Sequence, residues 1–263
     1  MKTNTFLTLF ILAIFLVSGC QSNSNEWDWE KDDYIVSDIL YANNAKLKQI
    51  SSKSGNQWTV FSEYEYDPLG RISKVSCPLY SDGKKIGDNF YDSYVYNASN
   101  QLEKILYYYN NLTTIENQLI YHHFYNEDGN KQKMLTEYLY NDQRDSILYF
   151  YENDRLIQTD KYDGGSIFPG PITIKYEYDT QGYLIKETSY SGIDPYEITL
   201  HSYQNKLNVK TEIFYYNMNV KAKEIRRFYD KNNNLIYLSS NDLLHSALSS
   251  SAAATYVLKY KYD

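Results

Sequence analysis

The chain is poor in the residues that mark several common protein classes. Among 263 residues there are two cysteines and four histidines, and 26 Lys and Arg face 33 Asp and Glu, which gives a net charge of −7. A basic face for nucleic acid is therefore not expected, and nucleic acid is excluded as a predicted partner. Glycine and proline are scarce, at 11 and 5 residues, so the composition differs from that of a disordered, low-complexity chain.

Recognisable catalytic and metal-binding motifs are also missing. The sequence contains no nucleophile elbow, P-loop or dinucleotide-binding fingerprint. His122 and His123 are adjacent, and on a strand they would point to opposite faces, where they cannot share one metal ion. Asp67 and Asp179 look like paired acids, but each stands at the same point of a repeat, where a turn explains it. The sequence therefore predicts no enzyme, no metal site and no cofactor.

The one long apolar run lies near the N-terminus, at residues 6–17. It is too short for a comfortable transmembrane helix, which needs about 20 residues, and it follows Lys2 as the apolar region of a signal peptide would. The run closes on VSGC at residues 17–20, which resembles the acylation box of bacterial lipoproteins. That resemblance implies a signal peptide over residues 1–19 and a lipid on Cys20. An ordinary secretory signal with a chance cysteine is the alternative.

An acidic segment follows the proposed anchor. Residues 20–33 include five carboxylates and no apolar periodicity, which predicts a solvated tether. Gln21 after the cysteine is compatible with outer-membrane sorting in lipoproteins of this kind. The acidic cluster resembles signals that export some lipoproteins to the cell surface, although a plain acidic linker is the alternative. The predicted location is the outer membrane, with the protein held by its lipid and facing the cell surface or the periplasm. With Cys20 acylated, Cys77 has no partner for an internal disulfide.

The most unusual feature is tyrosine, with 31 residues. Nine copies of one phrase begin at tyrosines 25 to 33 residues apart: Tyr41, Tyr66, Tyr96, Tyr125, Tyr151, Tyr178, Tyr203, Tyr229 and Tyr262. In copies with full spacing the next residue is Asp67, Asn97, Asn126, Asp179 or Asp230, with Ala42 as the exception. Four residues after the tyrosine stand Gly70, Asn100, Gly129, Gly182 and Asn233, with Ala45 as the exception. Six residues after it stand Leu47, Ile72, Leu102, Leu184 and Leu235, and Lys131 breaks the pattern.

These positions have the chemistry of a hairpin turn. Asp or Asn opens a type I turn through its own side chain, and Gly or Asn tolerates the left-handed conformation that closes it. Two copies, at residues 151–156 and 203–207, have shortened turns. Before the turns, tyrosines alternate with other residues, as in Tyr64/Tyr66 and Tyr176/Tyr178, so each pair lies on one face of a strand. Neighbouring strands are expected to stack these pairs into a tyrosine ladder.

The phrase Y-x-Y-D-x-x-G-R-[LI] at residues 64–72 resembles the YD repeat of the Rhs family, which includes bacterial toxin shells. The resemblance implies antiparallel strands that wind in a spiral sheet and can wall off a cavity. The expected fold is all-β, with about nine antiparallel hairpin repeats over residues 34–263 forming one extended, curled or spiral sheet. A short helix is expected over residues 241–255.

The two edges of this sheet are expected to differ. One edge carries the tight turns, and the other carries irregular connections at residues 81–89, 110–118, 163–171 and 191–195. Variable loops on a regular scaffold often carry binding function, and neutral insertions are an equal alternative.

The leading function hypothesis is a lipid-anchored envelope module that binds a glycan, a peptide or an envelope protein, because aromatic platforms suit sugars and proteins alike. One alternative is a structural spacer or shell element that assembles through sheet edges. A membrane-spanning barrel is disfavoured, because charged residues such as Glu63, Glu65, Lys175 and Glu177 alternate with tyrosine and leave no lipid-compatible face.

The anchor assignment predicts that Cys20→Ala leaves the precursor without lipid and moves it from the membrane fraction to soluble or mislocalised material. Metabolic labelling with a fatty-acid analogue measures this directly. Label incorporated into the Cys20→Ala protein would show that the acylated residue is a different one.

Overall fold

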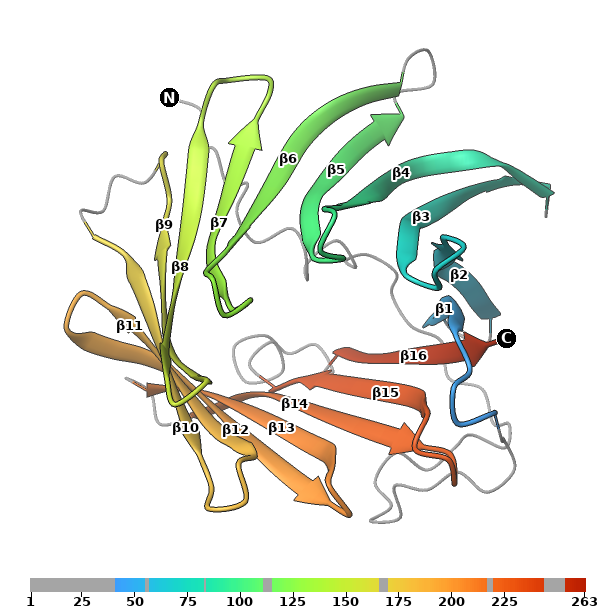
Figure 1. Ribbon diagram of the computed structural model, residues 1–263. Coiled ribbons are helices and arrows are strands. Elements are labelled where there is room, and N and C mark those ends of the chain that lie inside the picture. The colour runs from blue at the N-terminus through green and yellow to red at the C-terminus, as the bar shows by residue number, and fades with distance from the viewer. Residues whose placement is uncertain are drawn as a thin grey trace, which may run out of the picture.

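The computed structural model describes residues 41–54, 57–82, 84–110, 115–165, 170–216, 220–243 and 254–263. Within these ranges sixteen strands form one closed antiparallel barrel (Figure 1). The strands are β1 (Leu47–Ser54), β2 (Gln57–Tyr66), β3 (Ile72–Ser81), β4 (Lys84–Tyr96), β5 (Leu102–Asn110), β6 (Ile115–Tyr125), β7 (Lys131–Tyr138), β8 (Arg144–Glu152), β9 (Arg155–Tyr162), β10 (Ile172–Tyr178), β11 (Leu184–Ser191), β12 (Asp194–Gln204), β13 (Leu207–Tyr215), β14 (Val220–Tyr229), β15 (Leu235–Asp242) and β16 (Ala254–Tyr262). No helix in the described ranges is long and apolar enough to cross a membrane.

Some sequence predictions fall outside these ranges. The signal peptide, Cys20 and the acidic tether all lie within residues 1–33, which are not among the described residues. Most of the helix expected over 241–255 also lies outside them, and the described residues at its two ends belong largely to strands β15 and β16.

The sheet is all-β and antiparallel as predicted, but the prediction of an extended, curled or spiral sheet is wrong because the sheet closes. β1 pairs with β16, from Leu47 opposite Tyr262 to Ser52 opposite Leu258. In Figure 1 these two strands, blue and red, lie side by side and complete the ring. Closure gives every described strand two neighbours and removes the unpaired backbone groups that an open sheet leaves at its edges.

The first copy of the repeated phrase helps to close the ring by docking on the last copies. The backbone N–H of Tyr41 donates to Asp230 Oδ2 at 2.8 Å, and Asn232 Nδ2 donates to the Tyr41 carbonyl at 2.6 Å. The rings of Tyr41 and Tyr262 lie 5.1 Å apart. Lys48 Nζ and Asp263 Oδ1 form an ion pair at 2.7 Å. The two ends of the repeat array are therefore joined by side chains as well as by strand pairing.

The full-length turns have the predicted geometry. In the first of them, Gly70 N–H donates to the Asp67 carbonyl at 2.9 Å, and Asp67 Oδ1 accepts from the Arg71 N–H at 2.9 Å. The residue at the closing position is left-handed in five of the six turns: φ is +80° at Gly70, +62° at Asn100, +85° at Gly129, +91° at Gly182 and +67° at Asn233, and Ala45 is the exception. The Asp/Asn and Gly/Asn positions of the phrase are thus explained by the turn.

The two shortened copies make a different turn. In one, φ is +49° at Asn153 and +60° at Asp154, and in the other it is +48° at Asn205 and +71° at Lys206. Two consecutive left-handed residues are typical of a two-residue type I′ hairpin, whose twist matches that of the flanking strands. The repeat therefore tolerates a shorter turn without losing its strand pairing.

The tight turns and the other connections lie at opposite ends of the barrel, as an up-and-down order of strands requires. The loops at the second end are shorter than predicted. β4 begins at Lys84, β6 at Ile115 and β12 at Asp194, so much of the predicted irregular segments 81–89, 110–118 and 191–195 is strand. Cross-strand pairing extends into sequence that lacks a regular apolar pattern.

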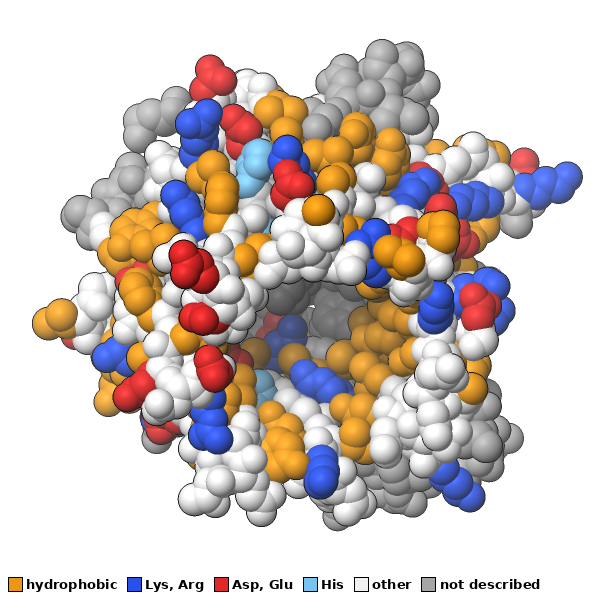
Figure 2. All heavy atoms as spheres, in the orientation of Figure 1, with side chains coloured by type: hydrophobic (Ala, Val, Ile, Leu, Met, Phe, Trp, Pro, Cys, Tyr) orange, Lys and Arg blue, Asp and Glu red, His pale blue; other side chains and the backbone are white. Residues whose placement is uncertain are grey.

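Alternation along the strands separates an inner from an outer wall. Phe124 is 45% exposed, and Val95 and Phe150 are also exposed, whereas the tyrosines on either side of Val95 and Phe150 are half-buried. On a closed barrel the concave side is the more enclosed one, so the repeat tyrosines line the lumen. Figure 2 shows the barrel hollowed at its centre, with hydrophobic, basic and His side chains visible inside the opening.

A compact apolar cluster lies on one side of the barrel. Val209, Phe228 and Tyr229 are buried together, and they pack against Leu207, Leu235 and Tyr237 on β13 to β15. Elsewhere the described strands bury small polar residues more often than large apolar ones, such as Ser76, Thr136, Thr159, Thr188 and Thr211. Strand pairing and the tyrosines therefore carry much of the stabilisation.

The turn geometry predicts the order of stability at Gly70. Gly70→Val forces a β-branched residue into a left-handed conformation, so it should cost more than about 1–2 kcal/mol. Gly70→Asn should cost less, because Asn100 and Asn233 hold the same position in sister turns. Denaturant melts measure both. Gly87→Val is the control, since a Cβ at Gly87 meets no atom within 4 Å. Equal costs for Val and Asn at Gly70 would contradict the turn assignment.

Candidate functional site in the barrel lumen

One ring of the lumen consists of eight tyrosines, one on each even-numbered strand. We call it the tyrosine ring; its members are Tyr66, Tyr96, Tyr125, Tyr151, Tyr178, Tyr203, Tyr229 and Tyr262. Seven of its hydroxyls donate to a backbone carbonyl at the start of the preceding strand, as Tyr66 does to Leu47 at 2.7 Å and Tyr262 to Leu235 at 3.0 Å. Each bond ties one hairpin to the next.

The strand register shifts at the same residues. Every tight hairpin from β2–β3 to β14–β15 has an irregularity immediately before its ring tyrosine, such as between Glu65 and Tyr66 or between Phe228 and Tyr229. A bulge increases the local twist and re-aims the side chains beside it. The repeated bulge therefore curves the sheet and directs each ring hydroxyl toward its carbonyl.

A second ring lies two residues earlier on the same strands, and we call it the ladder ring. Its members are Tyr64, Tyr94, His123, Tyr149, Tyr176, His201, Arg227 and Tyr260. Five are tyrosines that support the repeat. The repeat does not require His123, His201 or Arg227 at this position. These three residues therefore mark the parts of the lumen wall where a basic side chain replaces tyrosine.

Around His201 the departures form a connected network on β11 to β14. His201 Nε2 lies 2.8 Å from Glu187 Oε1, and His201 Nδ1 lies 3.2 Å from Thr211 Oγ1. Arg227 Nη1 donates to Thr211 Oγ1 at 2.8 Å and to Asn208 Oδ1 at 3.1 Å. The side chains of four strands are thus held in one arrangement on the wall.

Thr211, His201 and Glu187 are connected in the order hydroxyl, imidazole, carboxylate, as in a catalytic triad. The Thr211 hydroxyl, however, is not accessible to a ligand. Thr211 is 4% exposed, and its oxygen already accepts from Arg227. A nucleophile must reach its substrate, so the buried Thr211 hydroxyl is not placed to act as one. Beside this network, burial and then the nearby Glu187 raise the pKa of Glu197, while Lys223 opposes the shift.

Two buried polar groups, on β4 and β6, have unmet hydrogen-bonding capacity. Asp92 is 9% exposed, its Oδ1 has no hydrogen-bond partner among the described residues, and burial raises its pKa to about 6. His123 is 8% exposed, and neither of its ring nitrogens has a partner in the same part of the chain. Burial, reinforced by Lys131 and His122, lowers the pKa of His123 to about 4. Such groups are costly in a folded protein.

The outer wall carries networks of ion pairs. On β13 and β14, Lys221 Nζ contacts Glu212 at 2.8 Å and Glu224 at 2.7 Å, and Arg226 contacts Glu224 at 2.7 Å. On β10 and β11, Lys186 pairs with Glu177 at 2.7 Å. These residues lie on the face opposite the lumen by strand alternation. The predicted alternation of charge with tyrosine is therefore confirmed, with the charges outside.

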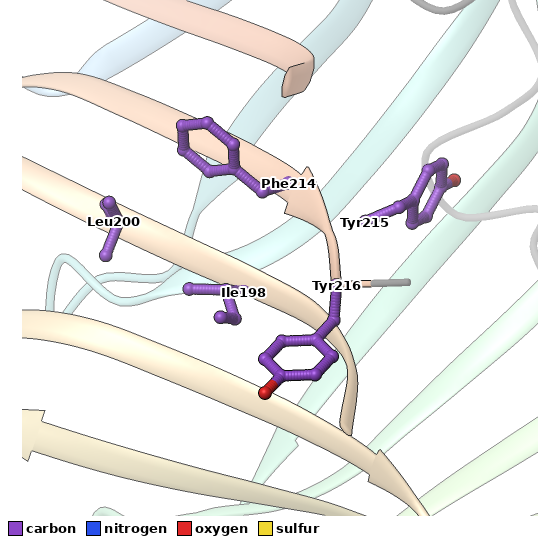
Figure 3. A pocket seen from close by; sticks show the side chains of 5 residues that line it. All are labelled: Ile198, Leu200, Phe214, Tyr215 and Tyr216. Atoms are coloured by element: carbon purple, nitrogen blue, oxygen red, sulfur yellow. The ribbon is translucent and has the colours of Figure 1, made fainter. Parts of the chain in front are cut away.

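The outer wall also has one shallow apolar hollow of about 550 Å³ among the described residues. Ile198 and Leu200 on β12 and Phe214 on β13 line it, together with Tyr215 and Tyr216 at the end of β13. In Figure 3 Phe214 and Tyr215 leave the strand in different directions, and Tyr216 flanks Ile198 at the end of the hollow. The residues carry no charge, so the hollow offers aromatic and aliphatic contact together with the tyrosine hydroxyls.

The structure places the other residues considered from sequence as follows. His122 and His123 point to opposite faces as predicted: His122 Nε2 lies 3.4 Å from Glu137 Oε2 on the outside, and His123 is buried. Cys77 is a free cysteine inside β3, not at its end. Sequence reasoning missed Glu187, His201 and Arg227. An alignment of the repeats at the ladder position, two residues before each ring tyrosine, could have found the last two.

Comparisons with known proteins show likeness of fold. No family model matches the chain, and no curated protein matches it. A porin-like protein from Bacteroides uniformis superposes with a TM-score of 0.52 at 9% sequence identity, over 82% of this chain and 98% of that one. A porin-like protein from Bacteroides vulgatus gives a TM-score of 0.49 at 12% identity, over 84% and 99%. The Tc holotoxin pore of Photorhabdus luminescens gives 0.23 at 11% identity, over 68% of this chain and 12% of that one.

The tyrosine ring predicts unequal effects of two matched substitutions. Tyr178→Phe removes a hydroxyl that donates to the Leu156 carbonyl at 2.8 Å and should lower the free energy of unfolding by about 0.5–1.5 kcal/mol. Tyr151→Phe should change it little, because the Tyr151 hydroxyl has no acceptor among the described residues. Denaturant melts compare the two variants. Equal losses would show that the hydrogen bond does not stabilise the repeat.

The pKa of Asp92 predicts a specific pH dependence. Its folded pKa of about 6 exceeds the unfolded value near 4, so the folded state binds the proton more tightly and stability falls as pH rises from 4 to 6. Asp92→Asn removes this loss and should raise the free energy of unfolding at pH 7 by about 1–3 kcal/mol. The difference between variant and wild-type melts should grow from pH 4 to pH 6 and then stay constant. A difference independent of pH would refute the shift.

Proposed function

We propose that this protein is a lipid-anchored outer-membrane module whose barrel binds a glycan in its lumen. The observation that supports the proposal is the lumen wall. Its two rings are mostly tyrosine, and they also include or adjoin imidazole, guanidinium and carboxyl groups. Tyrosine offers an apolar face together with a polar hydroxyl. Ligand sites typically combine such apolar surface with a few fixed polar groups.

The size of the barrel supports an internal site. Barrels of eight strands are filled by their own side chains, whereas barrels of 16 to 18 strands leave an aqueous space. This barrel has sixteen strands and is hollow when viewed along the opening in Figure 2. A chain of sugars has the length and the flat faces to lie along such a wall.

The charges on the outer wall favour a barrel that stands in water beside the membrane. A lipid-facing wall carries a continuous apolar band, and a Lys or Arg at the bilayer midplane costs about 2–4 kcal/mol. Here the outward positions carry ion pairs such as Lys186–Glu177 and Lys221–Glu212. The lipid on Cys20 would hold the protein to the outer membrane, and one further acyl chain makes such anchoring stable.

A membrane-spanning channel is the second candidate, because sixteen antiparallel strands in a closed barrel suit one and because the similar Bacteroides structures are titled porin-like. The spacer alternative relied on free sheet edges. Pairing of β1 with β16 removes those edges from the described strands.

Two measurements test the proposal. The full-length lipidated protein, purified in detergent, is applied to a glycan array, and the barrel variant Tyr176→Ala serves as the control for lumenal binding. Binding to defined glycans that weakens in the variant supports a lumenal site. Absence of glycan binding by folded protein, or binding unaffected by changes to lumenal tyrosines, contradicts it.

The second measurement separates the water-facing barrel from the channel. The chain from Gln21 to Asp263 lacks the lipid and is expected to remain soluble and folded without detergent. Aggregation that detergent or lipid vesicles reverse, together with ion conductance in a planar bilayer, would favour the channel.

A further inference from the structure

Comparing the repeats with one another singles out a second specialised place in the lumen, on β6 to β8. Near the start of each odd-numbered strand, the position equivalent to Lys131 holds Leu or Ile in six repeats and Asn208 in one. The six are Leu47, Ile72, Leu102, Leu156, Leu184 and Leu235, and Asn208 takes this position on β13 because it, and not Leu207, pairs with Tyr203. Lys131 faces Tyr125 on the neighbouring strand, and His123 precedes Tyr125 by two residues. The two departures from the repeat therefore stand side by side.

Three polar groups at this place have no hydrogen-bond or ion-pair partner among the described residues. Neither ring nitrogen of the buried His123 has one. Lys131 forms no ion pair within the described chain and lies over the ring of Tyr149, with Nζ 5.1 Å from its centroid. The hydroxyl of Tyr151 is the one in the tyrosine ring without a carbonyl acceptor among the described residues.

These groups lie in one electrostatic neighbourhood. Lys131 lowers the pKa of His123, and burial lowers the pKa of Lys131 itself. Burial, and then the neighbouring Tyr151, raises the pKa of Tyr125, which places the Tyr151 hydroxyl beside Tyr125. A half-buried ammonium without an anion is costly, and a bound anion would offset that cost.

We propose that Lys131 and Tyr151, backed by His123, form a subsite for the carboxylate of an acidic sugar. All three side chains can donate a hydrogen bond, and Lys131 supplies the positive charge, which is the complement of an anionic oxygen group. The ring of Tyr149 beside Lys131 provides an apolar face for the sugar itself. The inference rests on the proposed glycan-binding function and narrows it to uronic-acid-type ligands.

The test uses two ligands with the same sugar backbone, one with charged carboxylates and one in which methyl esterification has removed the charge. Full-length protein in detergent is titrated calorimetrically with oligogalacturonate and with the same oligosaccharide as its methyl ester. We expect the acid to bind at least about tenfold more tightly than the ester. One charge-assisted hydrogen bond contributes a difference in binding free energy of this size. Lys131→Leu should abolish that preference. Because Leu is the residue of the sister repeats, this variant is expected to fold, and melts verify it.

Matched variants complete the design. Lys133→Leu removes a charge from the same strand on the outer face and should leave the preference unchanged, whereas Tyr151→Phe should reduce it. His123→Tyr restores the sister residue and should also reduce it. A preference for acid that survives Lys131→Leu overturns the subsite.

The remaining outcomes separate the two proposals. Equal binding of acid and ester overturns the acidic subsite while leaving glycan binding intact. Binding of neither oligogalacturonate nor its ester, alongside neutral glycans bound on the array, also overturns the subsite only. An array without any bound glycan overturns both. A polyglutamate peptide that binds as tightly, with the same loss in Lys131→Leu, overturns the sugar assignment in favour of an acidic peptide.

Discussion

The structure depends on one repeated interaction, the hydrogen bond from a ring tyrosine to the carbonyl that begins the preceding strand. Seven such bonds, each beside a bulge, join the successive hairpins around the barrel. The turn makes this bond possible, because a left-handed residue such as Gly70 or Asn100 ends the loop and returns the chain in register. A sheet with a thin apolar core can be stable when each repeat contributes the same small increment.

Closure of the sheet divides the molecule into two walls with different chemistry. The inner wall receives the tyrosines, and the outer wall receives the ion pairs of residues such as Lys186 and Glu212. The outer wall also carries exposed apolar residues such as Phe124 and Phe150, so its surface is mixed. The same repeat that stabilises the barrel therefore also lines its lumen with aromatic rings. Departures from the repeat, such as His201 and Lys131, then give parts of that wall their own polar groups.

Much of the local structure was predictable from sequence, because it depends on residues close to one another in the chain. The turn at Asp67–Gly70 follows from side-chain chemistry within four residues, and the placement of Tyr64 and Tyr66 on one face follows from the period of a strand. The loops were predicted less well. Lys84 and Asp194 begin strands although their sequence looks irregular, because pairing with a neighbouring strand outweighs local preference. The network of Glu187 with His201 was missed for a related reason, since it joins strands whose register no single segment specifies.

The sequence by itself determined the repeat, its hairpin turns, the antiparallel class and the alternation of tyrosine with charge, since each depends on spacing along the chain. Only the tertiary structure decided that the sheet closes, because closure depends on the curvature summed over sixteen strands and on the meeting of β1 with β16. It also decided which face became the inside. Period-two alternation separates two faces without naming either, and the direction in which the bulged sheet curls assigns the tyrosines to the lumen.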